Sequence, residues 1–242
     1  MGGEPGRGVA ETLHNGWGTL KRYRLPDGST REVYDHGHAV ACLTRDPERD
    51  TVLLVRQTRV PILVHEDDIA REGAAATEPG ASVEAPAGLI DEGETPEGAM
   101  RREMREETGY RVHDLRRIAD LYASPGSLSE RMILFTARYD SGNRVAQGGG
   151  VASENEAVEV LEVSLSEALA MVRDSRVRDL KTAYLLQHAA LARADDVHNG
   201  PEGSRGSGSG GEEGTLRHFG PNPLIALGMR APGAASTTRA HT

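Results

Sequence analysis

Three glutamates near the middle of the chain, Glu103, Glu106 and Glu107, have a spacing that could gather their carboxylates. In a helix, positions i, i+3 and i+4 lie on one face, where like charges repel one another and destabilise the helix. A divalent cation removes that repulsion, and Mg²⁺ takes oxygen ligands from carboxylates and phosphates alike. Such an ion stabilises charge on a phosphoryl group and activates a water for attack. The alternative is a solvated acidic face balanced by nearby arginines, and the surrounding residues decide between the two.

Those surrounding residues form one pattern over 88–110 (GLIDEGETPEGAMRREMREETGY). Gly88 is followed after five residues by Glu94, and after seven more by Arg102 and Glu103. An acidic helix face alone explains neither the glycine nor the Arg-Glu pair in this register. The segment resembles the Nudix box, the loop–helix–loop of the Nudix hydrolases. The resemblance implies hydrolysis of a pyrophosphate bond in a nucleoside diphosphate linked to another group, with Mg²⁺, or Mn²⁺ in its place, as the cofactor.

The elements that must position the box can be predicted from apolar periodicity and turn residues. A box helix is expected at 96–108, with Thr95 as its cap, Pro96 at its first position and Gly109 at its end. Residues 64–83 lack periodicity and are predicted to form a loop. Two more helices are expected at 166–174 and 178–193, and strands at 18–25, 30–36, 38–44, 51–57, 114–122, 131–139 and 158–163.

This mixture of strands and helices predicts an α+β domain. The resemblance specifies a Nudix α/β/α sandwich with an N-terminal β-rich extension. The Gly-rich start predicts a flexible N-terminus at 1–14, followed by the Nudix domain at 15–195, of which 15–37 would be the extension. Glycines and serines after residue 200 predict a disordered tail at 196–242.

Composition excludes several classes of function. The formal net charge of −9 disfavours a nucleic-acid partner, which requires a basic face. No stretch approaches the ~20 apolar residues of a membrane span, so no membrane partner is expected. The single cysteine, Cys42, rules out an internal disulfide and lies in an apolar run, which is typical of a core residue in a cytoplasmic protein.

Segments outside the box narrow the substrate class. Residues 84–88 (EAPAG) and 124–130 (SPGSLSE) are similar to segments of the nucleoside-diphosphate-sugar branch, which includes ADP-ribose pyrophosphatases. A further set resembles the GDP-mannose pyrophosphatases, namely 31–35 (REVYD), 56–59 (RQTR), the triple glycine at 148–150, and 178–181 (RDLK). This resemblance implies cleavage of GDP-mannose to GMP and mannose 1-phosphate by a homodimer whose N-terminal strands reach the partner's site.

The resemblance also implies a role for individual residues. The metal ligands would be the carbonyl of Ala87 with Glu103, Glu107 and Glu156, and the catalytic residues Glu106, Glu107 and Glu156. The late glutamate could ligate metal, act as the base for the attacking water, or both, and Glu154 is the alternative to Glu156. The substrate-binding residues would be Trp17, Arg31, Glu32, Arg59, Ala87, Gly88, Leu89, Glu130 and Lys181.

Within the substrate-binding set, Arg59 and Lys181 would hold phosphates. Glu130 would accept hydrogen bonds from substrate hydroxyls or the base. Trp17 could stack on the base or serve as a core or edge aromatic. Arg31 and Glu32 would come from the partner subunit.

Three alternatives stay open. Thr30 and the long acidic 64–83 segment depart from the GDP-mannose pattern, so ADP-ribose is the second choice of substrate. A non-catalytic sensor of nucleotide sugars is the alternative of another class, although sensors of this kind usually lose box glutamates. Nucleotide sanitation is the third, and the diphosphate-sugar flanks argue against it.

Overall fold

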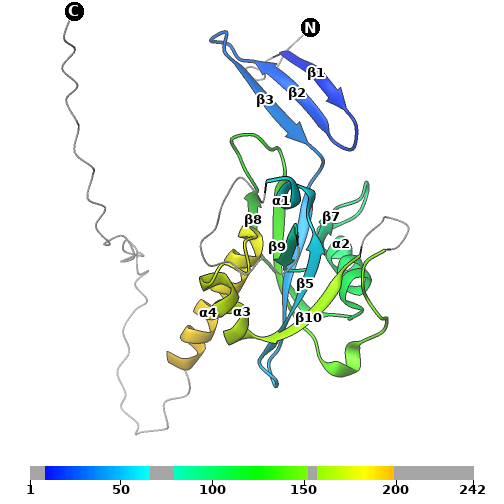
Figure 1. Cartoon of the computed structure of the whole chain (residues 1–242), viewed down its shortest axis with the longest axis vertical. Coiled ribbons are helices and arrows are strands. Elements are labelled where there is room, and N and C mark those ends of the chain that lie inside the picture. Colours follow the sequence, from blue (N-terminus) through cyan, green and yellow to red (C-terminus); the bar gives the residue numbers. More distant parts are fainter. Residues whose placement is uncertain (1–8, 66–78, 152–156, 199–242) are drawn as a thin grey trace, which may run out of the picture. The chain divides into compact units, whose positions relative to one another are not determined.

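A computed structural model describes residues 9–65, 79–151 and 157–198 of the chain (Figure 1). Its central sheet has seven strands. Five follow the order β10-β5-β4-β9-β8, while two short strands pair at its centre, β6 with β5 and β7 with β4. The pair β4–β9 is parallel and the other pairs are antiparallel. The strands are β4 (Ala39–Asp46), β5 (Thr51–Thr58), β6 (Ala81–Glu84), β7 (Ala87–Leu89), β8 (His113–Tyr122), β9 (Arg131–Arg138) and β10 (Glu159–Ser164).

Helices cover both faces of this sheet (Figure 1). Alternate residues of a strand point to opposite faces, so Ala41 and Leu43 of β4 pack under α3 and α4, whereas Val40 and Cys42 pack under α2. The result is the α/β/α sandwich that the sequence predicted. The helices are α1 (Val60–His65), α2 (Pro96–Glu103), α3 (Leu165–Arg173) and α4 (Leu180–His198), with a short 3₁₀ turn at Ser141–Asn143. Among the described helices, none is long and apolar enough to cross a membrane.

A separate three-stranded antiparallel sheet precedes the central one, in the order β1 (Val9–Asn15), β2 (Thr19–Arg24) and β3 (Thr30–Asp35). The end of β3 is tied to the loop before β9 by two main-chain hydrogen bonds. Tyr34 N donates to Ser127 O at 2.9 Å, and Ser129 N donates to Tyr34 O at 3.1 Å. The N-terminal sheet therefore joins the central domain beside the segment that carries Glu130.

Three boundaries expected from the sequence need correction. The extension begins at Val9, not at residue 15, because β1 pairs with β2 from Val9 to Asn15 with one irregularity between Thr12 and His14. The side chains of β1 are largely exposed, so the strand has no clear apolar pattern. The predicted 64–83 loop ends in strand β6, whose inward residues are Ser82 and Glu84 and therefore look polar in the sequence. Helix α4 continues to His198, beyond the expected boundary at 195. Residues 66–78 and the tail from 199 onward lie outside the described residues.

Candidate active site

The box helix begins where the sequence predicted. Gly98 N donates to the side chain of Thr95 at 3.1 Å, and Pro96 occupies the first turn. The helix is not uniform, however. It is an α-helix over Pro96–Glu103 and a π-helix over Met104–Thr108, where Gly109 ends it with a left-handed φ of 79°. The spacing of the glutamates had predicted a regular α-helix through residue 108. A π turn widens the helix because its backbone hydrogen bonds join residues five positions apart instead of four. Such turns within α-helices are frequent at functional sites.

The triple glycine caps the end of this helix. Gly149 N donates to Glu107 O at 2.8 Å, and Gly150 N donates to Glu106 O at 3.1 Å. These bonds satisfy carbonyls that a helix C-terminus otherwise leaves without partners. All three glycines have positive φ, and a Cβ on Gly148 would lie 2.6 Å from the carbonyl carbon of Thr108. Only glycine fits this close approach. The segment that contains Glu154 and Glu156 starts two residues beyond this cap, and both glutamates lie outside the described residues.

Arg102 organises the loop at the start of the box. Its guanidinium donates to both carboxylate oxygens of Glu94, at 3.2 and 3.0 Å, and to the carbonyl of Leu89 at 3.0 Å. It also bonds the carboxylates of Glu103 at 2.6 Å and Glu106 at 3.2 Å. Hydrogen bonds to Glu94 above all hold the pKa of Arg102 above its usual value. Glu94 therefore anchors the arginine, which in turn holds the loop at the start of the box.

The two glutamates expected to ligate metal turn toward strand β7. Glu103 is 8% exposed and Glu107 is 3% exposed. Glu107 Oε2 accepts a hydrogen bond from Ala87 N at 3.0 Å. Glu103 lies so close to Gly88 that any side chain at this position would overlap its carboxylate. Gly88 itself lies in β7, paired with Val40 of β4.

Two cations, Arg59 and Lys181, share one carboxylate partner, Glu84. Arg59 follows β5 and binds Glu84 through two parallel hydrogen bonds of 2.9 Å. Lys181, in the first turn of α4, bonds Glu84 at 2.7 Å and pairs with Asp179 at 2.9 Å. Burial by itself would raise the pKa of Glu84, but the hydrogen bond from Arg59 and the charge of Lys181 outweigh it and lower this pKa to about 2. Burial likewise opposes the charge on Lys181, yet Glu84 and Asp179 raise its pKa.

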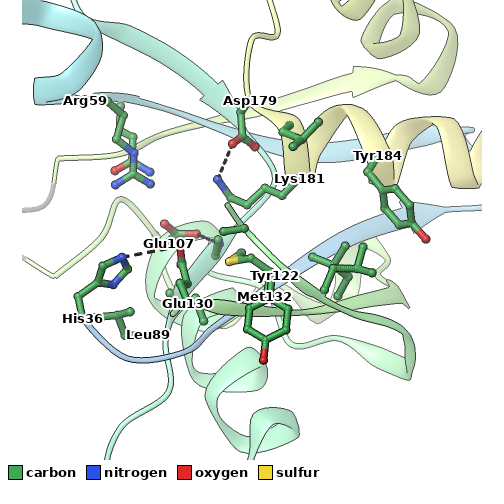
Figure 2. Close-up of a pocket in the computed structure, with 18 of the residues that line it drawn as sticks. His36, Arg59, Leu89, Glu107, Tyr122, Glu130, Met132, Asp179, Lys181 and Tyr184 are labelled. Atoms are coloured by element: carbon green, nitrogen blue, oxygen red, sulfur yellow. Dashed lines mark hydrogen bonds and ion pairs between the residues drawn. The ribbon is translucent and has the colours of Figure 1, made fainter. Parts of the chain in front are cut away.

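Arg59, Lys181 and Glu107 line one cavity of about 610 Å³ (Figure 2). In Figure 2, Arg59 and Lys181 lie on one side of Glu107, and His36 and Glu130 lie on the other. This volume is in the range of small-molecule sites. The structure thus brings together eight of the residues expected from the sequence, which are Trp17, Arg59, Ala87, Gly88, Leu89, Glu107, Glu130 and Lys181.

One end of the cavity is aromatic. Trp17 stands between β1 and β2 with 77% of its surface exposed, which excludes the interpretation as a core residue. Its ring stacks on that of His36 at a centroid distance of 5.0 Å. His36 Nε2 lies 3.7 Å from Glu130 Oε2. An exposed indole beside a carboxylate provides a stacking face and a hydrogen-bond acceptor at the same place.

Arg31 and Glu32 do not line this cavity. Both are exposed on β3, where Glu32 pairs with Arg22 at 2.8 Å within the same sheet. Their expected role in the site of a partner subunit stays a prediction, because the structure contains one chain.

Sequence reasoning missed several lining or organising residues. His36, Tyr122, Asp179 and Tyr184 line the cavity, and Glu84 binds both of its cations. Glu84 and Asp179 lie within segments that carried the family resemblance, so both residues belong to the recognised sequence pattern. The contacts of Glu84 with Arg59 and Lys181 span 25 and 97 positions along the chain, and such contacts leave no periodic signal in a sequence.

The donor set suits a hard cation. The buried carboxylates of Glu103 and Glu107 converge on the backbone at Ala87 and Gly88, and oxygen donors of this kind are what Mg²⁺ prefers. Within the described residues no group of three or more His, Cys, Asp or Glu side chains is placed to hold a metal ion. The expected set contains two described side chains, one backbone carbonyl, and Glu156 outside the described residues.

Comparison with known proteins places the chain in a family. The NUDIX domain profile matches residues 35–181. The GDP-mannose pyrophosphatase of Cronobacter sakazakii is 45% identical over 161 residues, which are 66% of this chain and 78% of that protein. The GDP-mannose pyrophosphatase of Escherichia coli O6:H1 is 39% identical over 189 residues, which are 76% of this chain and 91% of that protein.

Among solved structures, an ADP compounds hydrolase has a TM-score of 0.57 at 20% identity, and the alignment covers 79% of this chain and 94% of that one. This likeness shows the fold. The box in register, the sandwich around it and these relatives lead to one conclusion: the chain belongs to the NUDIX domain family and is a Nudix hydrolase.

Proposed function

We propose that the chain hydrolyses the pyrophosphate bond of a nucleoside diphosphate sugar, with Mg²⁺ as its cofactor and GDP-mannose as its first substrate. One observation carries the proposal. A single cavity joins Glu107 of the box helix, the cations Arg59 and Lys181, and the exposed ring of Trp17. A diphosphate needs the cations, a nucleobase can use the ring, and a hydrolytic metal needs the carboxylate. The names of the relatives favour GDP-mannose over other sugars.

The residues of the chain have distinct tasks in this reaction. Glu103, Glu107, the carbonyl of Ala87 and Glu156 would hold Mg²⁺, and Glu106 would hold a further ligand or a water. When bound, the ion supplies charge stabilisation at the phosphoryl oxygens and a water of lowered pKa. Arg59 and Lys181 bind the diphosphate and fix its orientation.

The late glutamate, Glu156 or alternatively Glu154, accepts the proton of the attacking water. The new P–O bond forms as the bond from the same phosphorus to the bridging oxygen breaks. The products are a nucleoside monophosphate and a sugar 1-phosphate. With GDP-mannose these are GMP and mannose 1-phosphate.

We further propose a cytoplasmic homodimer in which Arg31 and Glu32 serve the partner's cavity. Both residues are exposed and neither lines the cavity of its own chain, which supports a role in another subunit. Sedimentation at micromolar concentration tests the assembly, and a monomer under these conditions would contradict it.

The test of the reaction is a substrate panel with Mg²⁺ and Mn²⁺: GDP-mannose, ADP-ribose, UDP-glucose and a dinucleoside polyphosphate, with kcat/KM for each. We expect GDP-mannose to rank first and ADP-ribose second. Glu107→Gln should lower turnover by several orders of magnitude, since metal centres contribute that much. Glu97→Gln is the matched control, because Glu97 is exposed in the first turn of the same helix. Near-normal turnover in Glu107→Gln would refute the site.

The same panel separates the enzyme from the alternative of another class. ADP-ribose is the second candidate substrate, because the structural neighbour is named an ADP compounds hydrolase. Binding of a nucleotide sugar at micromolar concentration without any turnover would instead favour a sensor.

A further inference from the structure

The cluster around Glu84 has a feature that phosphate binding alone does not explain. Both cations that face the cavity are already bound to one carboxylate. Glu84 Oε1 accepts from Arg59 Nε, and Oε2 accepts from Arg59 Nη2 and Lys181 Nζ, at 2.9, 2.9 and 2.7 Å. The side chain of Glu84 is 4% exposed. A buried carboxylate is costly unless it is paired and hydrogen-bonded, so this arrangement needs both cations in these positions.

The elements explain why the three residues meet. In the antiparallel pair β5–β6, Glu84 lies opposite Val55, and Arg59 follows directly on the end of β5. Lys181 arrives on α4, whose start is fixed by Asp179. Thr182 N donates to Asp179 Oδ2 at 3.0 Å, and Thr182 Oγ1 accepts from Ala85 N, next to Glu84, at 2.6 Å. Strand β6 and the start of α4 are therefore locked together.

The geometry of the pairing leaves the cations able to bind an anion. A guanidinium has five N–H donors and an ammonium has three. Glu84 engages two donors of Arg59, and Glu84 and Asp179 pair with Lys181. Both side chains still line the cavity. The two-point contact fixes the plane of the guanidinium, which a single contact would not.

The charges of the cluster also cancel. Arg59 and Lys181 are balanced by Glu84 and Asp179. The cluster therefore presents oriented hydrogen-bond donors to a diphosphate without a large excess of positive charge. A large excess would bind the anionic products as strongly as the transition state. Interactions of equal strength in the ground state and the transition state do not raise kcat.

We propose that Glu84 is a positioning residue that holds Arg59 and Lys181 in the orientation the diphosphate requires. The inference rests on the proposed function for its kinetic consequence. Glu84 acts through the two cations and does not itself contact the substrate. Misplacement of a positioning group by about 1 Å can cost on the order of 100-fold in rate.

The kinetic test is a double-mutant cycle. Glu84→Gln keeps the shape of the side chain and should lower kcat by 10- to 100-fold, with KM changed less than threefold. In the Arg59→Ala background the same substitution should lower kcat/KM by a clearly smaller factor than in the wild type, because only Lys181 is left for Glu84 to position. Multiplicative losses in the double variant would overturn the proposal, as would a raised KM at unchanged kcat. Glu167→Gln is the matched control, since Glu167 pairs with Arg176 at 2.7 Å on α3 and does not line the cavity.

A second measurement needs no substrate. Arg59 Nε–H donates to the buried carboxylate of Glu84, although the Arg59 side chain itself is 40% exposed. Its NMR signal, assigned by its loss in Arg59→Ala, should therefore exchange with water more slowly than that of an arginine without such a bond. It should exchange at least tenfold faster in Glu84→Gln and be unchanged in Glu167→Gln. Equal protection in Glu84→Gln would overturn the positioning role. An inactive wild type with the expected exchange pattern would refute the proposed function and leave the positioning role standing.

Thermal unfolding checks that Glu84→Gln is folded. Should it not fold, Glu84→Asp retains the charge but is one methylene shorter, and the same loss of kcat and of exchange protection is expected. Wild-type values in Glu84→Asp would overturn the proposal.

Discussion

Gly88→Ala is the sharpest test of how the metal ligands are held. A Cβ at this position would lie 1.9 Å from Oε1 of Glu103, whereas ordinary contact begins at 3.4 Å. The carboxylate must therefore retreat by about 1.5 Å, and a misplacement of about 1 Å can cost 100-fold in rate. Gly88 does not have a positive φ, so alanine suits its backbone and the overlap alone produces the effect.

We expect Gly88→Ala to lower kcat/KM at saturating Mg²⁺ by about 100-fold, and to raise the Mg²⁺ concentration needed for half-maximal rate. The assay is release of nucleoside monophosphate across a Mg²⁺ titration. Gly126→Ala is the control, because a Cβ there would meet nothing within 4 Å. A Gly88→Ala enzyme with wild-type rate and Mg²⁺ dependence would show that Glu103 does not serve the metal where the structure places it.

Three further predictions concern stability and substrate binding. The folded pKa of Glu84, about 2, is below its ordinary 4.5, so its pairing stabilises the fold above pH 4.5 and is lost as the pH falls toward 2. Between pH 4.5 and pH 2, the free energy of unfolding measured with urea should fall by on the order of 3 kcal/mol less in Glu84→Gln than in the wild type. Gly28→Ala should cost about 1 kcal/mol for its positive φ alone, whereas Gly148→Ala, which also overlaps backbone, should cost about 3 kcal/mol by the same measurement. Trp17→Ala should raise KM by about 10- to 100-fold with little change in kcat, and an unchanged KM would exclude base stacking.

The parts of this protein that the sequence predicted are those with local signals. The cap at Thr95, the stop at Gly109 and the register of the glutamates are all set by residues a few positions apart. Strands β4, β5 and β9 carry nearly continuous apolar runs, which are typical of strands buried on both faces, and their predicted positions were close to those observed. The grouping of Arg59 and Lys181 in one cavity came from family resemblance, because no local pattern encodes it.

The parts that escaped prediction have physical reasons. Strand β6 buries Ser82 and Glu84, so its inward face looks polar. Strand β1 is mostly exposed and is held by main-chain hydrogen bonds, which any sequence can make. The π turn after Glu103 is capped by glycines some forty positions later, and a contact between such distant residues leaves no local signal. His36 enters the cavity because the end of β3 is tied to the loop before β9, a pairing between distant segments.

The aromatic end of the cavity has a practical consequence. Trp17 is the single tryptophan of the chain, so all indole emission reports on one place. Its large exposure and its contact with the His36 ring make that emission sensitive to any molecule that enters beside it. A purine nucleotide that stacks on the indole should quench the fluorescence, while inorganic pyrophosphate, which has no ring, should bind and leave it nearly unchanged. The unlabelled protein thus carries its own optical sensor, one that distinguishes occupation of the base end of the cavity from occupation of the phosphate centre.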